Sequence, residues 1–338
     1  MRLSIVDQSP VPAGVTPADA LRNTIDLARV ADALGYTRYW IAEHHSTPAF
    51  ASPAPEILID RVASETSAIR VGSGAVLLPH YSPLKVAETF RVLHALYPGR
   101  IDLGIGRAPG SGPLEAYALL RDRGRQMPDD FPEQLVELLA FLGGGFPADH
   151  PFRQILVTPQ MPGAPPVWLL GSSEWSAHAA AQLGLPYAFA HFINAEATRV
   201  SLEYYRTHVT AAAGSLAGQM ILALGVICAD TDAEARRLYA SQRLRRLLRR
   251  TGDRGPIPTP EEALVRLKGI PDDTGDENGE WPRVVVGAPE RVHAELSEMA
   301  RQLHVDELMV VTVVHDHRAR LRSHELLAEV FGLTPRQA

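Results

Sequence analysis

Residues 39–45 read Tyr-Trp-Ile-Ala-Glu-His-His, an apolar run that stops abruptly in three ionisable side chains. Aromatic and β-branched residues favour a buried or half-buried strand, so the run predicts a strand over Tyr39–Ala42. Glu43, His44 and His45 then follow its carboxyl end. In parallel sheets, open or closed, ligands bind at that end of the strands. The stretch therefore predicts a strand that presents polar groups to a ligand.

Strands and helices alternate along the rest of the chain. Short apolar runs predict eight strands, and helical periodicity predicts helices between them. Continuous apolar strands that alternate with helices indicate a parallel sheet covered on both faces. The simplest closure of eight such strands is a (β/α)8 TIM barrel, and a doubly wound open sheet is the alternative. The predicted strands cover residues 3–6, 39–42, 70–78, 101–105, 167–170, 187–190, 220–229 and 307–314.

The whole chain, residues 1–338, is expected to form one barrel domain with insertion loops. Two stretches fall outside the repeat. Arg107–Phe131 is long for a barrel loop, and Arg249–Pro282 is polar and loop-like. Long loops in compact domains are usually lids or disordered segments. We therefore expect an excursion near 249–282 that lies over the end of the seventh strand.

Composition excludes several classes of protein. With 46% hydrophobic and 21% charged residues, the chain is typical of globular proteins. A net charge of -6 does not supply the positive field that nucleic-acid binding needs. The single cysteine, Cys228, excludes an intramolecular disulfide framework and a cysteine-based zinc site. No run approaches the roughly 20 apolar residues of a membrane span. A cytoplasmic protein without membrane contact is expected.

Polar residues gather at the carboxyl ends of the predicted strands. In a barrel these ends converge on one mouth, which is where barrel enzymes bind their substrates. A ligand site is therefore predicted there. Besides Glu43, His44 and His45, the polar residues at strand ends are His80, Tyr81, Arg107, Ser172, Ser173, His191, His315, Asp316 and His317.

Gly171-Ser172-Ser173 predicts an anion site. The glycine lets a ligand approach the backbone, and the serines begin a helix whose first N–H groups have no partner in the helix. The alternative is that a serine merely caps the helix. Arg107, after the fourth strand, could bind the same anion with two hydrogen bonds or could be an ordinary surface arginine.

Other chemistries fit less well. Gly104-Ile105-Gly106 resembles a dinucleotide fingerprint, but proline stands at the third glycine position. No Gly-x-Ser-x-Gly elbow is present for a serine nucleophile. His315 and His317 are the best candidates for a metal pair. A barrel metal hydrolase would normally carry a His-x-His motif at the first strand, where this chain has Asp7-Gln8-Ser9.

Four motifs, in order, resemble the bacterial luciferase-like flavin monooxygenases over nearly the whole chain. Four ordered motifs are more specific than any one of them. The resemblance is closest to the single-gene luciferase-like proteins of bacteria. The motifs are Trp-Ile-Ala-Glu-His-His (40–45), Val-Gly-Ser-Gly-Ala-Val-Leu-Leu-Pro (71–79), Tyr-Pro-Gly-Arg-Ile-Asp-Leu-Gly-Ile-Gly-Arg-Ala-Pro-Gly (97–110) and Val-Trp-Leu-Leu-Gly-Ser-Ser (167–173).

The resemblance implies a (β/α)8 barrel that binds reduced FMN. It implies that Ser172, Ser173 and Arg107 hold the phosphate and that Gly171, which precedes the serines, also contacts the cofactor. The flavin ring would lie against the third strand, where the family has a non-prolyl cis peptide that maps to Gly74–Ala75.

The implied reaction joins reduced flavin, delivered by a separate reductase, with O2 to give a C4a-peroxide that attacks an organic substrate. His44 is favoured as the catalytic imidazole, with Glu43 and His45 in support, although His45 fits equally by position. A homodimer is also implied. An enzyme that uses the deazaflavin F420 for hydride transfer and a non-catalytic flavin-binding protein remain alternatives.

Overall fold

The computed structural model describes residues 1–108, 110, 112–119, 129–210, 216–271 and 280–336. Its strands are β1 (Arg2–Asp7), β2 (Arg38–Ile41), β3 (Arg70–Ser73), β4 (Val76–Leu77), β5 (Ile101–Gly106), β6 (Val167–Gly171), β7 (Tyr187–Ala190), β8 (Met220–Cys228), β9 (Val284–Gly287) and β10 (Glu307–Val311). Its helices are α1 (Pro17–Leu34), α2 (Pro55–Ser64), α3 (Pro83–Leu96), α4 (Pro113–Leu119), α5 (Phe131–Leu139), α6 (Glu174–Leu183), α7 (Thr198–His208), α8 (Asp232–Arg250), α9 (Pro260–Arg266), α10 (Pro289–Leu303) and α11 (His317–Val330).

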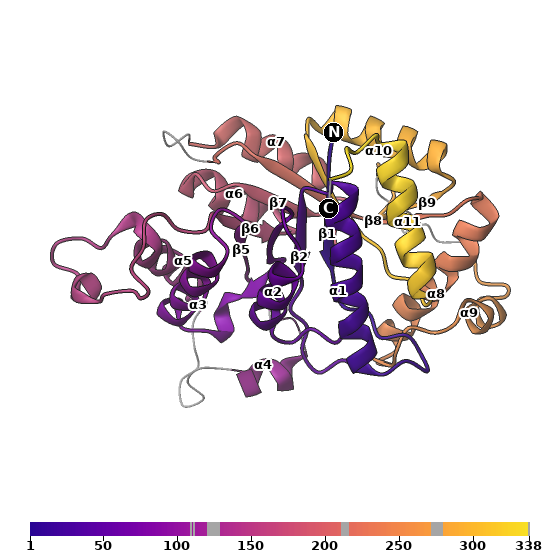
Figure 1. The fold of residues 1–338 in the computed structure, drawn as a ribbon, viewed down its shortest axis with the longest axis horizontal. Coiled ribbons are helices and arrows are strands. Elements are labelled where there is room, and N and C mark those ends of the chain that lie inside the picture. Colours follow the sequence, from indigo (N-terminus) through magenta and orange to yellow (C-terminus); the bar gives the residue numbers. More distant parts are fainter. Residues whose placement is uncertain (109, 111, 120–128, 211–215, 272–279, 337–338) are drawn as a thin grey trace.

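The strands form a closed parallel barrel surrounded by helices (Figure 1). The order around the barrel is β1, β2, β3, β5, β6, β7, β8 and β10. It closes because β10 pairs with both neighbours: Glu307 lies opposite Arg2 of β1 and opposite Ile221 of β8. The predicted (β/α)8 barrel is confirmed.

The third predicted strand is broken in two. A continuous strand over residues 70–78 is wrong, because β3 ends at Ser73 and a separate short strand, β4, begins at Val76. The peptide bond between Gly74 and Ala75, in the gap, is cis, as the family resemblance implies. Both strands pair with β5, so the barrel wall continues across the break.

The excursion near 249–282 is more ordered than the sequence indicates. It contains α9, and it is followed by β9, a strand that the sequence analysis missed. Strand β9 pairs with Gly225–Cys228, the second half of β8, beyond the part of β8 that pairs with β10. The excursion also reaches the loop after the first strand, because the backbone of Ile257 bonds to Val11 and Ala13. Residues 272–279 lie outside the described part.

Helix α7 starts at Thr198 and ends at His208, where the backbone of Val209 turns to an extended conformation. This helix packs against the barrel through buried Leu202 and Tyr205.

Alternation along β2 shows how the strands build two cores. Tyr39 and Ile41 belong to the layer between the barrel and the helices, whereas Trp40 and the following Ala42 belong to the barrel interior. This is the period of two expected for strand side chains. Because Ala42 ends the inward series, Glu43 and the histidines emerge at the mouth.

The opposite end of the barrel is closed by buried charges. The Arg38 guanidinium donates to Asp102 at 2.7 Å and to Glu307 at 2.8 Å, and it lies 4.7 Å from the ring centre of Trp168. Asp102 also accepts from the indole of Trp40 at 3.1 Å. All five side chains are buried. This network fills the amino end of the barrel, so a ligand is expected at the carboxyl end.

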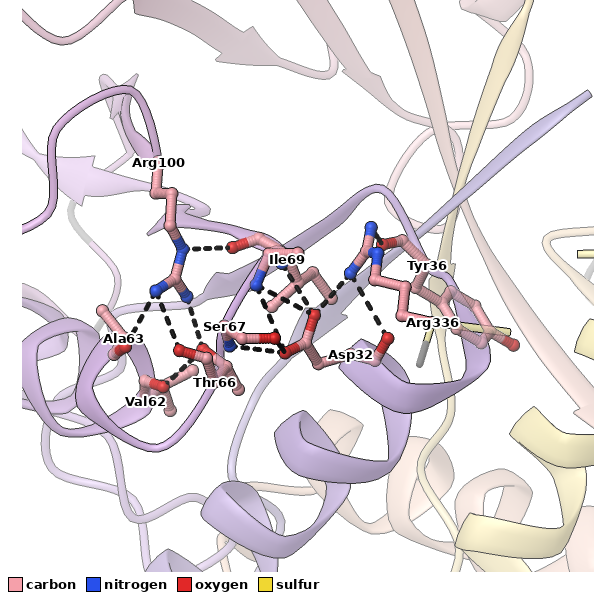
Figure 2. A network of polar contacts seen from close by, with 10 residues as sticks. Asp32, Tyr36, Val62, Ala63, Thr66, Ser67, Ile69, Arg100 and Arg336 are labelled. Carbon is pink, nitrogen blue, oxygen red and sulfur yellow. Dashed lines mark hydrogen bonds and ion pairs between the residues drawn. The ribbon is translucent and has the colours of Figure 1, made fainter. Parts of the chain in front are cut away.

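A second polar network fixes the loops outside the same end (Figure 2). Asp32 of α1 accepts backbone N–H groups of Ser67 and Ile69 and pairs with Arg336 near the carboxyl terminus. Arg100 donates to the Ile69 carbonyl and to others nearby. The last part of the chain is thus tied to the first helix, away from the mouth.

Candidate active site

Glu43 is the centre of a buried hydrogen-bond cluster at the mouth. Its Oε1 accepts from His45 Nε2 at 2.7 Å and from the Tyr81 hydroxyl at 2.9 Å, while its Oε2 accepts from the Leu77 backbone N–H at 3.0 Å. An ionised carboxylate only accepts hydrogen bonds, so Nε2 of His45 carries the hydrogen in this arrangement.

Tyr81 and His80 complete the surroundings of this cluster. Burial and the neighbouring Glu43 carboxylate raise the pKa of Tyr81, so its hydroxyl stays a donor. The ring of His80 lies edge-on to that of His45, with ring centres 5.8 Å apart. Glu43 therefore fixes the orientation of the His45 ring.

His44 differs from His45 in its environment. Its ring packs on Phe50 with centres 4.7 Å apart, and its backbone N–H donates to the Ser52 carbonyl. Its Nδ1 is buried without a hydrogen-bond partner among the described residues. Burial, and then the positive charge of Arg249, lower the pKa of His44 to about 4. His44 is therefore a neutral imidazole with an unused nitrogen at neutral pH.

The Gly74–Ala75 segment borders this pair of histidines. The Gly74 N–H donates to the Ile41 carbonyl at 2.8 Å, which ties the segment to the end of β2. Two residues beyond Ala75, Leu77 gives its N–H to Glu43. Ala75 itself is buried. The cis peptide and the Glu43 cluster are thus neighbours in the same wall of the mouth.

Helix α6 begins directly after Gly171, Ser172 and Ser173. Ser173 is the N-cap residue, but its hydroxyl makes no capping hydrogen bond, so the alternative of a mere serine cap is wrong. Its carbonyl instead accepts from the Ser176 hydroxyl at 2.6 Å. The Ser172 carbonyl accepts from the side chain of Asn194 at 2.9 Å. A Cβ at Gly171 would overlap Ser176, so glycine is required where β6 meets the helix.

Arg107 lies at the same helix end. It follows β5, and its guanidinium is 4.7 Å from the ring centre of Trp175, in the first turn of α6. It is exposed and forms an ion pair with Asp129. The structure therefore brings together Arg107 and the serines before α6, although they are more than 60 residues apart in the sequence.

Other polar residues at the strand ends have structural partners. His191 is fully buried and is bonded to the Thr198 hydroxyl and to the Pro282 carbonyl, and burial lowers its pKa. His315 is bonded to a carbonyl of the first loop, and His317 to Asp26 on α1. The sequence analysis placed these histidines at strand ends as candidates for a ligand site. In the structure their ring nitrogens bond to other parts of the protein and connect loops and helices.

The described ranges contain no group of three or more histidine, cysteine, aspartate or glutamate side chains that could hold a metal ion. His315 and His317 use their Nε2 atoms on different partners. The metal alternative therefore has no support in this part of the chain. Within the same ranges, no helix is long and apolar enough to cross a membrane.

Three neighbours of the site were missed by sequence reasoning. Phe50 and Trp175 stand close to predicted site residues, and their aromatic character was an available signal. Arg249 stands next to the last residue of an arginine-rich run, Arg243–Arg250, that is most simply interpreted as a solvated helix face. Nothing in its spacing indicates that its charge acts on the pKa of His44.

The family follows from a comparison of the whole chain with known proteins. A family model described as luciferase-like monooxygenase matches residues 1–307. The chain belongs to the luciferase-like monooxygenase family. This luciferase-like monooxygenase is 35% identical to the N-acetyl-S-alkylcysteine monooxygenase of Bacillus subtilis (strain 168), over 97% of this chain and 98% of that protein. It is 37% identical to a luciferase-like monooxygenase of Escherichia coli (strain K12), over 97% of this chain and 96% of that protein.

Solved structures share the fold. The crystal structure of apo-MsnO8 is 50% identical, with a TM-score of 0.91 and 99% coverage of each chain. The oxygenating constituent of 3,6-diketocamphane monooxygenase from Pseudomonas putida, in complex with FMN, has a TM-score of 0.71 at 23% identity, with both chains covered in full. An F420-dependent secondary alcohol dehydrogenase has a TM-score of 0.64 at 15% identity, covering 97% of this chain and 98% of that one.

Proposed function

We propose that this luciferase-like monooxygenase uses reduced FMN, supplied by a separate reductase, and O2 to oxidise a small organic substrate. One observation carries the proposal: two features lie at the same mouth of the barrel. The first is the start of α6, where the Ser173 side chain makes no capping hydrogen bond and Arg107 lies nearby, and the second is the pair of histidines near Gly74–Ala75. The FMN complex of a fold neighbour and the monooxygenase relatives support the choice of cofactor and reaction.

The phosphate of FMN fits the start of α6. The first N–H groups of the helix, the free capping hydroxyl of Ser173 and the neighbouring Ser172 supply donors, and the helix dipole favours negative charge there. Arg107 adds a guanidinium that matches phosphate geometry. It would exchange its exposed ion pair with Asp129 for the phosphate. Gly171 leaves the backbone accessible.

The ring end of the cofactor fits beside Gly74–Ala75 and the two histidines. A ligand anchored at α6 would reach across β5 toward β3 and β2, since these strands are consecutive in the barrel. Gly74 and Ala75 present almost no side chain there. The buried, unpartnered Nδ1 of His44 is the polar atom that such a ligand would meet.

Each histidine has a distinct role in this proposal. When bound, reduced FMN supplies the electrons that activate O2 for transfer of one oxygen atom to the substrate. His44, neutral at pH 7, accepts or returns a proton at its free Nδ1. His45 is held by Glu43 with Nε2–H toward the carboxylate. Glu43 acts by positioning His45.

Equilibrium binding tests the phosphate site directly. Arg107→Gln and Ser173→Ala should each weaken FMN binding by about 10-fold, because each removes a hydrogen bond to a charged group. Riboflavin, which lacks the phosphate, should bind the variants and the wild type alike. F420 should bind much more weakly than FMN. Equal losses for FMN and riboflavin would contradict the phosphate assignment, and a preference for F420 would favour the hydride-transfer alternative.

The homodimer is part of the same proposal and has a candidate surface. Helices α2 and α3 expose large apolar side chains: Ile57 is 68% exposed, Val92 47% and Leu96 59%. Between these helices runs a groove lined partly by Val92, Leu93 and Leu96. An interface here would cover this apolar surface. Ile57→Glu with Leu96→Glu should convert a dimer to a monomer in sedimentation velocity, and a monomeric wild type would contradict the assignment.

A further inference from the structure

A groove lies on the outside of the barrel, between α3 and the segment after α5 that leads to β6. Its volume is about 550 Å³, which is in the range of sites that bind small organic ligands. The segment extends away from the barrel beside α3 and α5 (Figure 1). The residues proposed to bind the flavin follow the carboxyl ends of strands, whereas this segment leads into the start of β6. The groove is therefore separate from the mouth.

Two arginines line the groove, and one short stretch of backbone holds both of them. Nη2 of Arg91, on α3, donates to the Leu142 carbonyl at 3.1 Å. Nη1 of Arg153 donates to the Phe146 carbonyl at 3.3 Å. Because these carbonyls are close in the sequence, the two guanidinium groups are attached to the same stretch. A guanidinium has five N–H donors, and each of these bonds uses one of them. Donors therefore remain on both groups.

The charge of these two arginines is not balanced locally. Neither forms an ion pair with the part of the chain that the structure describes, and no described residue that lines the groove carries a carboxylate. The groove between α2 and α3 differs, because Glu56, Asp60 and Glu88 line it. The positive character thus belongs to one groove of a chain whose net charge is -6. Such a local positive site is expected to attract an anion.

Large apolar side chains form other walls of the same groove. Ile155 is 39% exposed and Leu156 is 63% exposed, and Met161 also lines the groove. The ring of Phe146, another lining residue, packs on that of Phe141 with centres 4.8 Å apart. Apolar walls with a few convergent charged groups are typical of sites for small organic molecules. A ligand with an apolar body would cover these exposed side chains.

We infer that this groove binds a small amphiphilic organic anion, with a carboxylate or phosphate head at Arg91 and Arg153 and an apolar chain or ring on Ile155 and Leu156. Both kinds of head match a guanidinium through two parallel hydrogen bonds. The arginines select for negative charge, and the apolar walls select against anions that lack an apolar body. Binding here requires neither FMN nor turnover, so it stands apart from the proposed function.

The test is calorimetric titration of the whole chain with octanoate, octyl phosphate, 1-octanol and inorganic phosphate. At least one of the two octyl anions should bind about 10-fold more tightly than octanol and than inorganic phosphate, and the better of the two identifies the head. Arg91→Gln and Arg153→Gln should each weaken that anion about 10-fold and leave octanol unchanged. Arg206→Gln, at an exposed arginine of α7, changes the net charge equally and should leave the anion affinity unchanged.

A second readout locates the ligand. An octanoate analogue with a photoreactive diazirine on its chain should label peptides from residues 153–161, and Arg153→Gln should reduce this labelling. Saturation with FMN should leave the affinity for the octyl anion unchanged. Displacement of the anion by FMN, or labelling at the mouth, would place the ligand in the flavin site and overturn the inference.

Two other results would also overturn it. One is equal affinity for octanol and for both octyl anions, and the other is an equal loss of anion affinity in Arg153→Gln and Arg206→Gln. Nε of Arg91 is buried, so Arg91→Gln is first compared with the wild type in urea unfolding. The side chain of Arg153 is exposed, so Arg153→Gln keeps the test decisive if Arg91→Gln does not fold.

Discussion

Replacing His44 with glutamine should remove an acid-sensitive contribution to stability. Burial and the charge of Arg249 lower the pKa of His44 from 6.5 to about 4 in the folded protein. The unfolded chain binds a proton at the ordinary value, so protonation favours unfolding. The contribution of His44 is therefore fully present above pH 6.5 and is lost as the pH falls toward 4. Between these values the loss amounts to about 3 kcal/mol.

The measurement is the free energy of unfolding in urea at several pH values between 7.5 and 4. The curve for the wild type minus that for His44→Gln should decline by about 3 kcal/mol over this range, with most of the change below pH 6.5. His324 is also buried with a lowered pKa, but it is present in both proteins and cancels in the difference. His208→Gln, at an exposed histidine, is the matched control.

A flat difference for His44→Gln would refute the reasoning. It would mean that His44 takes up a proton in the folded protein as readily as in the unfolded chain, so the ring is hydrated and its Nδ1 is not a buried, unused group. A difference that rises toward low pH would show that a nearby negative charge dominates over burial and Arg249. Either result would remove the basis for a neutral His44 at pH 7.

Three further changes test other parts of the structure. Glu43→Gln should reverse the tautomer of His45, because the amide places a donor toward Nε2. Nitrogen-15 NMR of the ring should then show the hydrogen on Nδ1, and an unchanged tautomer would contradict the assigned hydrogen bond. Gly171→Ala should cost about 1–3 kcal/mol in urea unfolding, because its Cβ overlaps Ser176, and a neutral effect would show that α6 shifts freely. Arg38→Met should cost about 3–5 kcal/mol, because it leaves the buried Glu307 without its close guanidinium partner and Asp102 with Arg70 alone. A loss below about 1 kcal/mol would show that water reaches that end of the barrel.

The barrel was predictable because its strands are short apolar runs with clear turn signals. The strand β9 was missed although Val284-Val285-Val286 is a β-branched run, because eight strands already completed a barrel and the polar stretch before it indicated a loop. The buried pairing of Arg38 with Asp102 and Glu307 could not be read from the sequence. Their positions are far apart, and a charged residue at a strand start is usually solvated.

The candidate site was predictable in position but not in detail. Strand ends located His191 and His315 at the mouth as readily as His44, since sequence spacing gives the end of a strand but not the direction of the side chain that follows it. The partners decide the difference: a hydroxyl and a carbonyl satisfy His191, whereas Nδ1 of His44 has none among the described residues. The effect of the Arg249 charge on the pKa of His44 depends on the tertiary placement of α8, and no local pattern encodes that placement.

The most direct test of the proposed reaction is anaerobic titration of the purified protein with reduced FMN, oxidised FMN and F420, followed by rapid mixing of the reduced complex with O2. Tight binding of reduced FMN, with an absorbance transient that precedes oxidised flavin and is weakened in His44→Ala, is the predicted result. Preferential binding of F420, with no transient after oxygen is added, would contradict a monooxygenase and leave the barrel and its anion site in place.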